Sequence, residues 1–206
     1  EGRQRCRRGP STGPVAALPS SRTIEDDARH DARRKCQNDL HPRFDHLFMN
    51  VTPAETADVD PLARIWHDSW HETHAHLLPP ELIRFRTLES FRDRLRAALP
   101  HLRVVGPAGA PLGFCIVKGD ELDQLFVSTQ ARGTGVAAAL TADAERLLAE
   151  RGVRTAWLAC AIGNDRAARF YEKCGWRRVG TMVHRAVTSD GVFPLEAWRF
   201  EKDLST

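Results

Sequence analysis

The chain has 206 residues, of which 42% are hydrophobic, and this is enough for one sizeable core in a globular domain. The formal net charge of +3 belongs to residues 1–48, which hold ten of the 30 basic and seven of the 27 acidic residues; residues 49–206 are neutral. A neutral body lacks the clustered basic charge of a nucleic-acid-binding surface, so we expect no nucleic-acid partner.

The five cysteines are odd in number and form no CxxC pair, which argues against a disulfide framework or a zinc ribbon and favours a reducing compartment. No apolar run approaches the roughly 20 residues that span a bilayer, and no signal peptide opens the chain. We therefore expect a soluble, cytoplasmic protein with no membrane partner.

Residues 1–48 show no sustained helical or strand periodicity, and their composition predicts a disordered or non-native N-terminal extension. Met49 is the first methionine and immediately precedes regular patterning. We expect the natural chain to begin there and one folded domain to occupy residues 49–206.

Two helices are expected at the start of this domain. Thr52-Pro53-Ala54-Glu55 has the form of a helix start, with a restart at Asp60-Pro61. Pro79-Pro80 ends this unit, and a second helix is predicted over Leu88–Leu99. One face of the first helix is apolar at helical spacing: Leu62, Ile65, Trp66, Ser69 and Trp70.

Strands follow the two helices. Three are predicted over Leu102–Val105, Leu112–Lys118 and Leu122–Ser128, and the turns between them imply antiparallel pairing. A glycine turn then leads into a helix that ends at Gly152. Val153–Cys160 is almost wholly apolar, which is typical of a strand buried on both faces.

The rest of the chain reads as a helix and a hairpin: Asn164–Cys174, Trp176–Val187 and Phe193–Glu201, with Pro194 marking an edge or a bulge. A helical crossover links Leu122–Ser128 to Val153–Cys160, so these two strands should be parallel. The order predicts an α/β (α+β) domain with a mixed, mostly antiparallel twisted sheet, a central parallel pair and helices on both faces.

The glycine turn has the local pattern of an anion site. An apolar run ends at Ser128, Gly133 and Gly135 allow a tight backbone turn, and an alanine-rich helix begins at once. Convergent N–H groups and the partial positive charge of a helix N-terminus bind phosphate groups. We therefore expect a phosphate-bearing ligand at this turn.

Two motifs resemble the GNAT superfamily of N-acetyltransferases. Arg132-Gly133-Thr134-Gly135-Val136-Ala137 matches its (Gln/Arg)-x-x-Gly-x-(Gly/Ala) signature, and it lies between a strand and the following helix, as in that superfamily. The segment from Asn164 to Trp176 is similar to the superfamily's Asn-x-x-Ala-x-x-Phe-Tyr-x-x-x-Gly-(Phe/Trp) element. The resemblance covers residues 49–206.

The resemblance implies the GNAT fold and an enzyme that transfers the acetyl group of acetyl-CoA to a primary amine in a ternary complex. It places the pyrophosphate of the cofactor on the N–H groups of Gly133, Thr134, Gly135, Val136 and Ala137, with Arg132 opening the loop. It also places the pantetheine arm along the strand that ends at Phe126 and Val127, where two strands splay apart. The N–H near Val127 then acts as an oxyanion-hole donor.

Tyr171, the only tyrosine, lies seven residues after Asn164 and therefore on nearly the same helix face. The resemblance makes Tyr171 the general acid for the departing thiolate and Asn164 a cofactor-binding residue. The alternative is a packed tyrosine whose hydroxyl bonds to the backbone. Members of the superfamily use a carboxylate on the fourth strand, a histidine or an ordered water as the general base. Glu121 is the first choice here, and Asp123 lies on the same side of the strand; the alternative is that both are solvated charges of the turn.

The acceptor side is expected on the first helix, at Trp66, His67, Trp70 and His71. His67 and His71 have a spacing that can chelate a metal, but no third ligand is evident, so no metal is expected. The acceptor is a small-molecule or peptide amine, and the sequence does not choose between them. It also leaves a homodimer open.

Two other functions fit part of the pattern. Gly133–Ala138 can be read as the GxGxxA of a dinucleotide-dependent oxidoreductase, but the strand Val153–Cys160 lacks the carboxylate that such a site needs. A non-catalytic coenzyme A-binding module would have the glycine turn but no general acid. The presence of Tyr171 favours catalysis.

Overall fold

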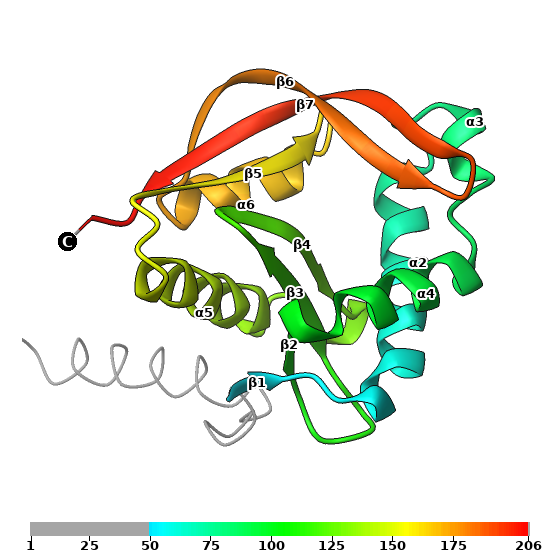
Figure 1. Cartoon of the computed structure of the whole chain (residues 1–206), viewed down its shortest axis with the longest axis horizontal. Helices are drawn as coiled ribbons and strands as arrows, with labels where there is room; N and C mark the ends of the chain where they lie inside the picture. The colour runs from blue at the N-terminus through cyan, green and yellow to red at the C-terminus, as the bar shows by residue number, and fades with distance from the viewer. Residues whose placement is uncertain (1–49, 206) are drawn as a thin grey trace, which may run out of the picture. The chain divides into compact units, whose positions relative to one another are not determined.

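The computed structural model describes residues 50–205, so the predicted extension and Met49 lie outside the described residues. Within this range one sheet carries strands in the order β1-β2-β3-β4-β5-β7-β6 (Figure 1). The strands are β1 (Val51–Pro53), β2 (Leu102–Val105), β3 (Gly113–Lys118), β4 (Glu121–Val127), β5 (Thr155–Ala161), β6 (Arg177–Thr188) and β7 (Gly191–Asp203). The helices are α2 (Val59–His74), α3 (Pro80–Ile83), α4 (Leu88–Ala98), α5 (Val136–Glu150) and α6 (Asp165–Lys173).

The sheet is antiparallel except between β4 and β5, which are parallel. The helix α5 makes the crossover between these two strands, and this explains their direction. The predicted fold class, a mixed and mostly antiparallel sheet with a central parallel pair, is confirmed.

The start of the domain differs from the prediction. Thr52-Pro53-Ala54-Glu55 does not begin a helix, because Val51–Pro53 forms the edge strand β1 against β2. A short 3₁₀ turn, Thr56–Asp58, follows, and the N–H of Glu55 donates to Asp58 Oδ2 (2.8 Å) before α2 begins at Val59. A three-residue strand that contains proline gives no alternating pattern in the sequence, and proline is tolerated there because the strand is at an edge.

Helices cover both faces of the sheet, as predicted (Figure 1). On one face, α2 and α4 bury Trp66, Phe91 and Leu95 in a cluster that includes Phe114 and Ile116 of β3. On the opposite face, α5 and α6 pack in a second cluster with the alternate β3 residues. The strand therefore contributes to two cores because its side chains alternate between the faces.

The strand β5 is buried less completely than predicted. Ala156, Leu158 and Cys160 are buried, but Trp157 and Ala159, on the other face, are only half-buried. The expectation of burial on both faces is therefore wrong for one face, where Ala159 lines a cavity. Pro194 lies in the part of β7 that β5 does not reach, since β5 pairs with residues 197–203; the edge prediction is correct.

Between residues 50 and 205, none of the helices combines the length and apolar character that crossing a membrane requires.

Candidate active site

The site begins where β4 and β5 separate. These strands pair at one position, Glu121 opposite Trp157. Further along β4, the Ser128 N–H donates to Leu112 O on the β3 side (2.8 Å). Hydrogen-bonding direction alternates along an antiparallel strand, so the N–H groups of Leu125 and Val127 point toward β5, which is out of reach. The splayed strands thus offer backbone donors to an extended ligand.

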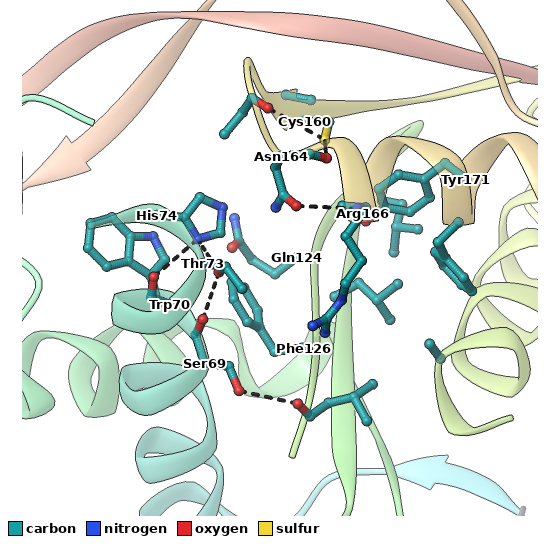
Figure 2. Close-up of a pocket in the computed structure, with 18 of the residues that line it drawn as sticks. Ser69, Trp70, Thr73, His74, Gln124, Phe126, Cys160, Asn164, Arg166 and Tyr171 are labelled. Atoms are coloured by element: carbon teal, nitrogen blue, oxygen red, sulfur yellow. Dashed lines mark hydrogen bonds between the residues drawn. The ribbon is translucent and has the colours of Figure 1, made fainter. Parts of the chain in front are cut away.

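A cavity of about 610 Å³ occupies this region. Figure 2 shows that side chains of α2 approach it from one side and those of α6 from the other, with Gln124 and Phe126 of β4 between them. The α2 side contributes Ser69, Trp70, Thr73 and His74. Ser69 Oγ donates to the carbonyl of Val127 (3.2 Å), which ties α2 to the open edge of β4.

The glycine turn forms one end of the cavity. Gly133 and Gly135 have φ angles of +78° and +95°, a region that favours glycine. Gly135 is the N-cap of α5, and neither a capping side chain nor an acidic residue occupies the first turn. The first N–H groups of α5, including those of Ala137 and Ala138 in the cavity wall, therefore lack helical partners. This is an anion-binding geometry.

Not every residue of the predicted loop contacts the cavity. Arg132, Gly133, Gly135 and Ala137 line it, and so do Phe126 and Val127. Val136 is instead 1% exposed in the core, and the Thr134 hydroxyl donates to Ala131 O (2.7 Å). These two side chains shape the loop. The N–H of Thr134 also donates to Ala131 O (3.4 Å), so of these two residues only Val136 has a backbone N–H that can face a ligand.

Arg132 and Asn164 are held in place from their own sides of the cavity. The Arg132 guanidinium forms a bidentate pair with Glu72 of α2, at 2.6 and 2.7 Å. Asn164 Oδ1 accepts the N–H of Ala167 (3.2 Å) as the N-cap of α6, so its side-chain amide N–H groups remain available. Both placements suit a ligand lying between the glycine turn and α6.

Tyr171 lines the cavity from α6, among the rings of Phe170, Trp176 and Phe200. No residue in the described range forms a hydrogen bond with its hydroxyl. The alternative of a hydroxyl satisfied by the backbone therefore finds no support in residues 50–205. Burial raises the pKa of Tyr171 above its ordinary value, so the hydroxyl stays protonated, the state that a proton donor needs.

The two carboxylates considered as bases differ in position. Asp123 lines the cavity, and its oxygens are bonded to Lys118 Nζ (2.8 Å) and Gln124 Nε2 (3.1 Å). Glu121 is not among the lining residues. Burial, together with the nearby Asp123 carboxylate, raises the pKa of Glu121 from 4.5 to about 7.

Of the four predicted acceptor residues, two line a cavity and two do not. Trp70 lines the main cavity and Trp66, 1% exposed, a smaller adjoining one. His67 and His71 line neither and bond instead to Asp68 Oδ1 (2.8 Å) and Arg86 O (2.7 Å). His67 and His71 are four residues apart and therefore lie on one face of α2. That face lies against α4 and the segment before it, and not against the cavity. No three metal-binding side chains among residues 50–205 gather into a metal site.

Among the lining residues that the sequence did not predict, four carry a basic or imidazole side chain at the acceptor end. His74 stacks on Trp70, with ring centroids 5.4 Å apart, and burial lowers its pKa to about 4. Arg86, Arg94 and His184 reach the cavity from the α3–α4 region and from β6. In the sequence, Arg94 looks like a solvated charge on an amphipathic helix, and Arg86 and His184 belong to no motif, so nothing local indicates their role.

A family model described as the acetyltransferase (GNAT) family matches residues 59–176, more than half of the chain. This chain belongs to the GNAT family. The match runs from the start of α2 to Trp176 and contains both motifs singled out in the sequence. The family predicted from those motifs is confirmed.

Curated N-acetyltransferases match parts of the chain. An uncharacterised N-acetyltransferase of Mycobacterium tuberculosis is 36% identical over 87 residues, 40% of this chain and 52% of the relative. The chain thus spans about half the length of the first relatives it matches. The peptidyl-lysine N-acetyltransferase YjaB of Escherichia coli is 28% identical over 137 residues, 65% of this chain and 86% of YjaB.

Solved structures show the same GNAT fold. The solution structure of apo YjaB has a TM-score of 0.56 at 23% identity and covers 74% of this chain and 95% of YjaB. The PaiA N-acetyltransferase of Thermoplasma acidophilum, solved in complex with coenzyme A, has a TM-score of 0.53 at 17% identity and covers 75% and 98%. At these identities the likeness concerns the fold alone.

Proposed function

We propose that this protein is an acetyl-CoA-dependent N-acetyltransferase that acts on a primary amine. The observation that carries the proposal is a cavity lined by two sets of backbone donors, at the open edge of β4 and at the uncapped N-terminus of α5. The same cavity is lined by Tyr171, whose hydroxyl is free within residues 50–205. This arrangement matches a long ligand with a phosphate-bearing part and an amide-containing arm.

Each part of the cofactor has residues suited to it. The N–H groups from Gly133 to Ala138 would hold the pyrophosphate, and no acidic residue in the first turn of α5 opposes it. The N–H and C=O groups along β4 would pair with the pantetheine arm as an added strand would. The Asn164 side chain would bind the same arm from α6.

The reaction follows from this placement. The amine nitrogen attacks the thioester carbon, and the N–H of Leu125 or Val127 stabilises the negative charge that develops on the carbonyl oxygen. The C–S bond then breaks, the sulfur takes a proton from the Tyr171 hydroxyl, and the new C–N bond remains as an amide. The amine loses one proton in this sequence, and solvent reprotonates Tyr171.

We propose that His184 accepts the proton of the amine, in place of Glu121. His184 lines the cavity, and no residue in the described range occupies its ring nitrogens. Burial lowers the pKa of His184, an effect that Asp123 partly opposes, so the imidazole is neutral and able to accept a proton at neutral pH. Glu121 has a suitable pKa but no direct access.

The variants His184→Gln and Glu121→Gln separate these assignments. We expect His184→Gln to lower kcat by about 100-fold or more and to remove the acidic limb of its pH profile, and Glu121→Gln to change neither. The reverse pattern would assign the base to Glu121. If neither variant changes kcat or its pH profile, the proton of the amine is accepted by water.

The alternative of a non-catalytic coenzyme A-binding module makes a different prediction. Both functions give a thermal shift with coenzyme A and none with NADH. Only the enzyme releases free thiol from acetyl-CoA in the presence of an amine. Since YjaB is named a peptidyl-lysine acetyltransferase, the amine panel should include lysine peptides as well as small amines. Coenzyme A binding without thiol release for any amine of the panel would contradict the enzymatic proposal.

A further inference from the structure

The acceptor end of the site contains an excess of buried positive charge. A second cavity of about 230 Å³ adjoins the main one and shares with it Arg86, Arg94, Asp123, Gln124, His184 and Ala186. The shared wall makes the two cavities parts of one acceptor region, between β4 and the β6–β7 hairpin. The glycine turn lines only the main cavity, so the smaller one lies away from the expected pyrophosphate.

Arg86 is 4% exposed, which is rare for an arginine. One of its nitrogens, Nη1, donates to the carbonyl of Val187 (2.8 Å) and fixes the side chain against β6. A guanidinium has five N–H donors, and no other described residue takes the remaining ones. Arg86 is therefore rigidly placed and still able to donate to a ligand.

Arg94, which is half-buried, is the second cation of this region. Its guanidinium carbon lies 4.3 Å from the centre of the Trp66 ring, and it makes no hydrogen bond or ion pair within residues 50–205. Burial and the nearby Arg86 lower the pKa of Arg94 to about 10, so the group is still charged at neutral pH. The aromatic face orients the guanidinium but does not satisfy its donors.

The local carboxylates do not balance this charge. In the described part of the chain, Asp123 is the one acidic residue that lines the smaller cavity, and Lys118 already pairs with it at 2.8 Å. Glu196 lines the main cavity and not the smaller one. A buried guanidinium and a half-buried one beside it are unfavourable without an anion, because a charge withdrawn from water needs a partner. The region is thus built to receive an anionic group.

We propose that the acceptor is a small amine that also carries a carboxylate, and that Arg86 and Arg94 bind this carboxylate while the amine faces the thioester. The inference rests on the proposed acetyltransferase function and specifies its substrate class. The planar guanidinium fork matches a carboxylate in two parallel hydrogen bonds. The small volume of the cavity, about 230 Å³, favours a free amino-acid-like molecule over a protein side chain.

The first experiment compares matched acceptors by thiol release. Each acceptor in a series of amino acids with increasing distance between amine and carboxylate is paired with its methyl ester, with the alkylamine of the same length and with the aminoalkyl phosphonate. We expect at least one amino acid to exceed its ester and alkylamine by about 10- to 100-fold in kcat/KM. A phosphonate used better than every carboxylate, or equal use of neutral and acidic amines, would overturn the assignment.

The second experiment changes Arg94, because Arg86 also donates a hydrogen bond to β6 and its loss could disturb the fold. Arg94→Gln should raise KM for the preferred amino acid by about 10- to 100-fold and leave KM for acetyl-CoA unchanged, whereas Arg94→Lys should retain part of the preference. Arg96→Gln is the matched control, because Arg96 lies on the same helix, pairs with Asp93 (3.0 Å) and lines neither cavity. Equal effects of Arg94→Gln and Arg96→Gln would contradict the proposal.

A binding measurement separates this inference from the proposed function. With coenzyme A present, at least one amino acid of the series should raise Tm of the wild type and not of Arg94→Gln, and the alkylamine of the same length should raise neither. If no amine supports thiol release but this pattern holds, the enzymatic proposal fails and the anion site stands. If amines are acetylated without the pattern, the function stands and the anion site fails.

Discussion

At the scale of single residues, Tyr171 carries the clearest prediction. Tyr171→Phe removes one oxygen from a side chain that packs among three aromatic rings, so the fold should tolerate it. We expect kcat to fall by about 100- to 10,000-fold, the usual contribution of a general acid, with KM for acetyl-CoA nearly unchanged. Steady-state kinetics checks this, and an unchanged kcat would assign the hydroxyl a packing role.

Glu121 gives a prediction about stability. Its pKa is about 7 in the folded protein and 4.5 ordinarily, so the folded state binds this proton more tightly than the unfolded state does. Ionisation therefore destabilises the fold progressively as pH rises from about 4.5 to 7. Tm of Glu121→Gln minus that of the wild type should be larger at pH 8 than at pH 4.5.

The change in Tm can be converted to free energy, and a second variant provides the control. Each kcal/mol corresponds to about 2–4 °C in a domain of this size. The control is Glu81→Gln, which removes an exposed carboxylate at the start of α3. Its Tm difference from the wild type should not increase between pH 4.5 and pH 8 as that of Glu121→Gln does. A Tm difference for Glu121→Gln that is constant over this window would contradict the raised pKa.

At the scale of elements, the glycine turn before α5 has a matched counterpart. Gly133 and Gly109, in the turn between β2 and β3, have φ angles of +78° and +76°, and a Cβ at either would contact nothing within 4 Å. Both Gly→Ala changes should destabilise the fold by about 1–2 kcal/mol through backbone strain alone. Only Gly133→Ala should also weaken coenzyme A binding, because it moves donors of the loop. Calorimetric titration checks this, and equal coenzyme A affinities in the two variants would count against the loop.

The same elements show what the sequence could predict. The strands β2, β3 and β4 and the helices α4 and α6 were predicted to within about one residue, because period and capping signals such as Asn164 agree there. The strand β1 was missed because three residues carry no period. The α2 face was predicted from Trp66 and Trp70, but the exposed appearance of His67 and His71 in the sequence could not show that they bond away from the cavity.

The acceptor side was less predictable for a physical reason. Arg94 lies on α4, His184 lies on β6, and 89 positions of sequence separate them, yet both line the same cavity. Their proximity depends on how the β6–β7 hairpin and α4 approach β4, which local periodicity does not specify. The cofactor side, in contrast, is built from contiguous stretches such as residues 132–138. Sequence motifs therefore located the donor end of the site and not the acceptor end.

At the scale of the molecule, the gap between β4 and β5 divides the sheet. The strands β1 to β4 form one half and β5, β7 and β6 the other, and a single paired position, Glu121 opposite Trp157, joins their backbones. A ligand that pairs with the open edge of β4 would supply part of the missing ladder. Binding should therefore stabilise the whole domain and protect specific amides.

We expect coenzyme A at 100 times its Kd to add about 2.7 kcal/mol to the free energy of unfolding. Hydrogen exchange should slow most at the amides of Leu125, Val127 and Gly133 and of residues 135–138, because these donors gain partners on binding. Amides of the β6–β7 hairpin should slow only by the global amount, and their exchange is the internal control. Uniform slowing across residues 50–205, without extra protection at β4, would mean that the ligand does not occupy the gap between the strands.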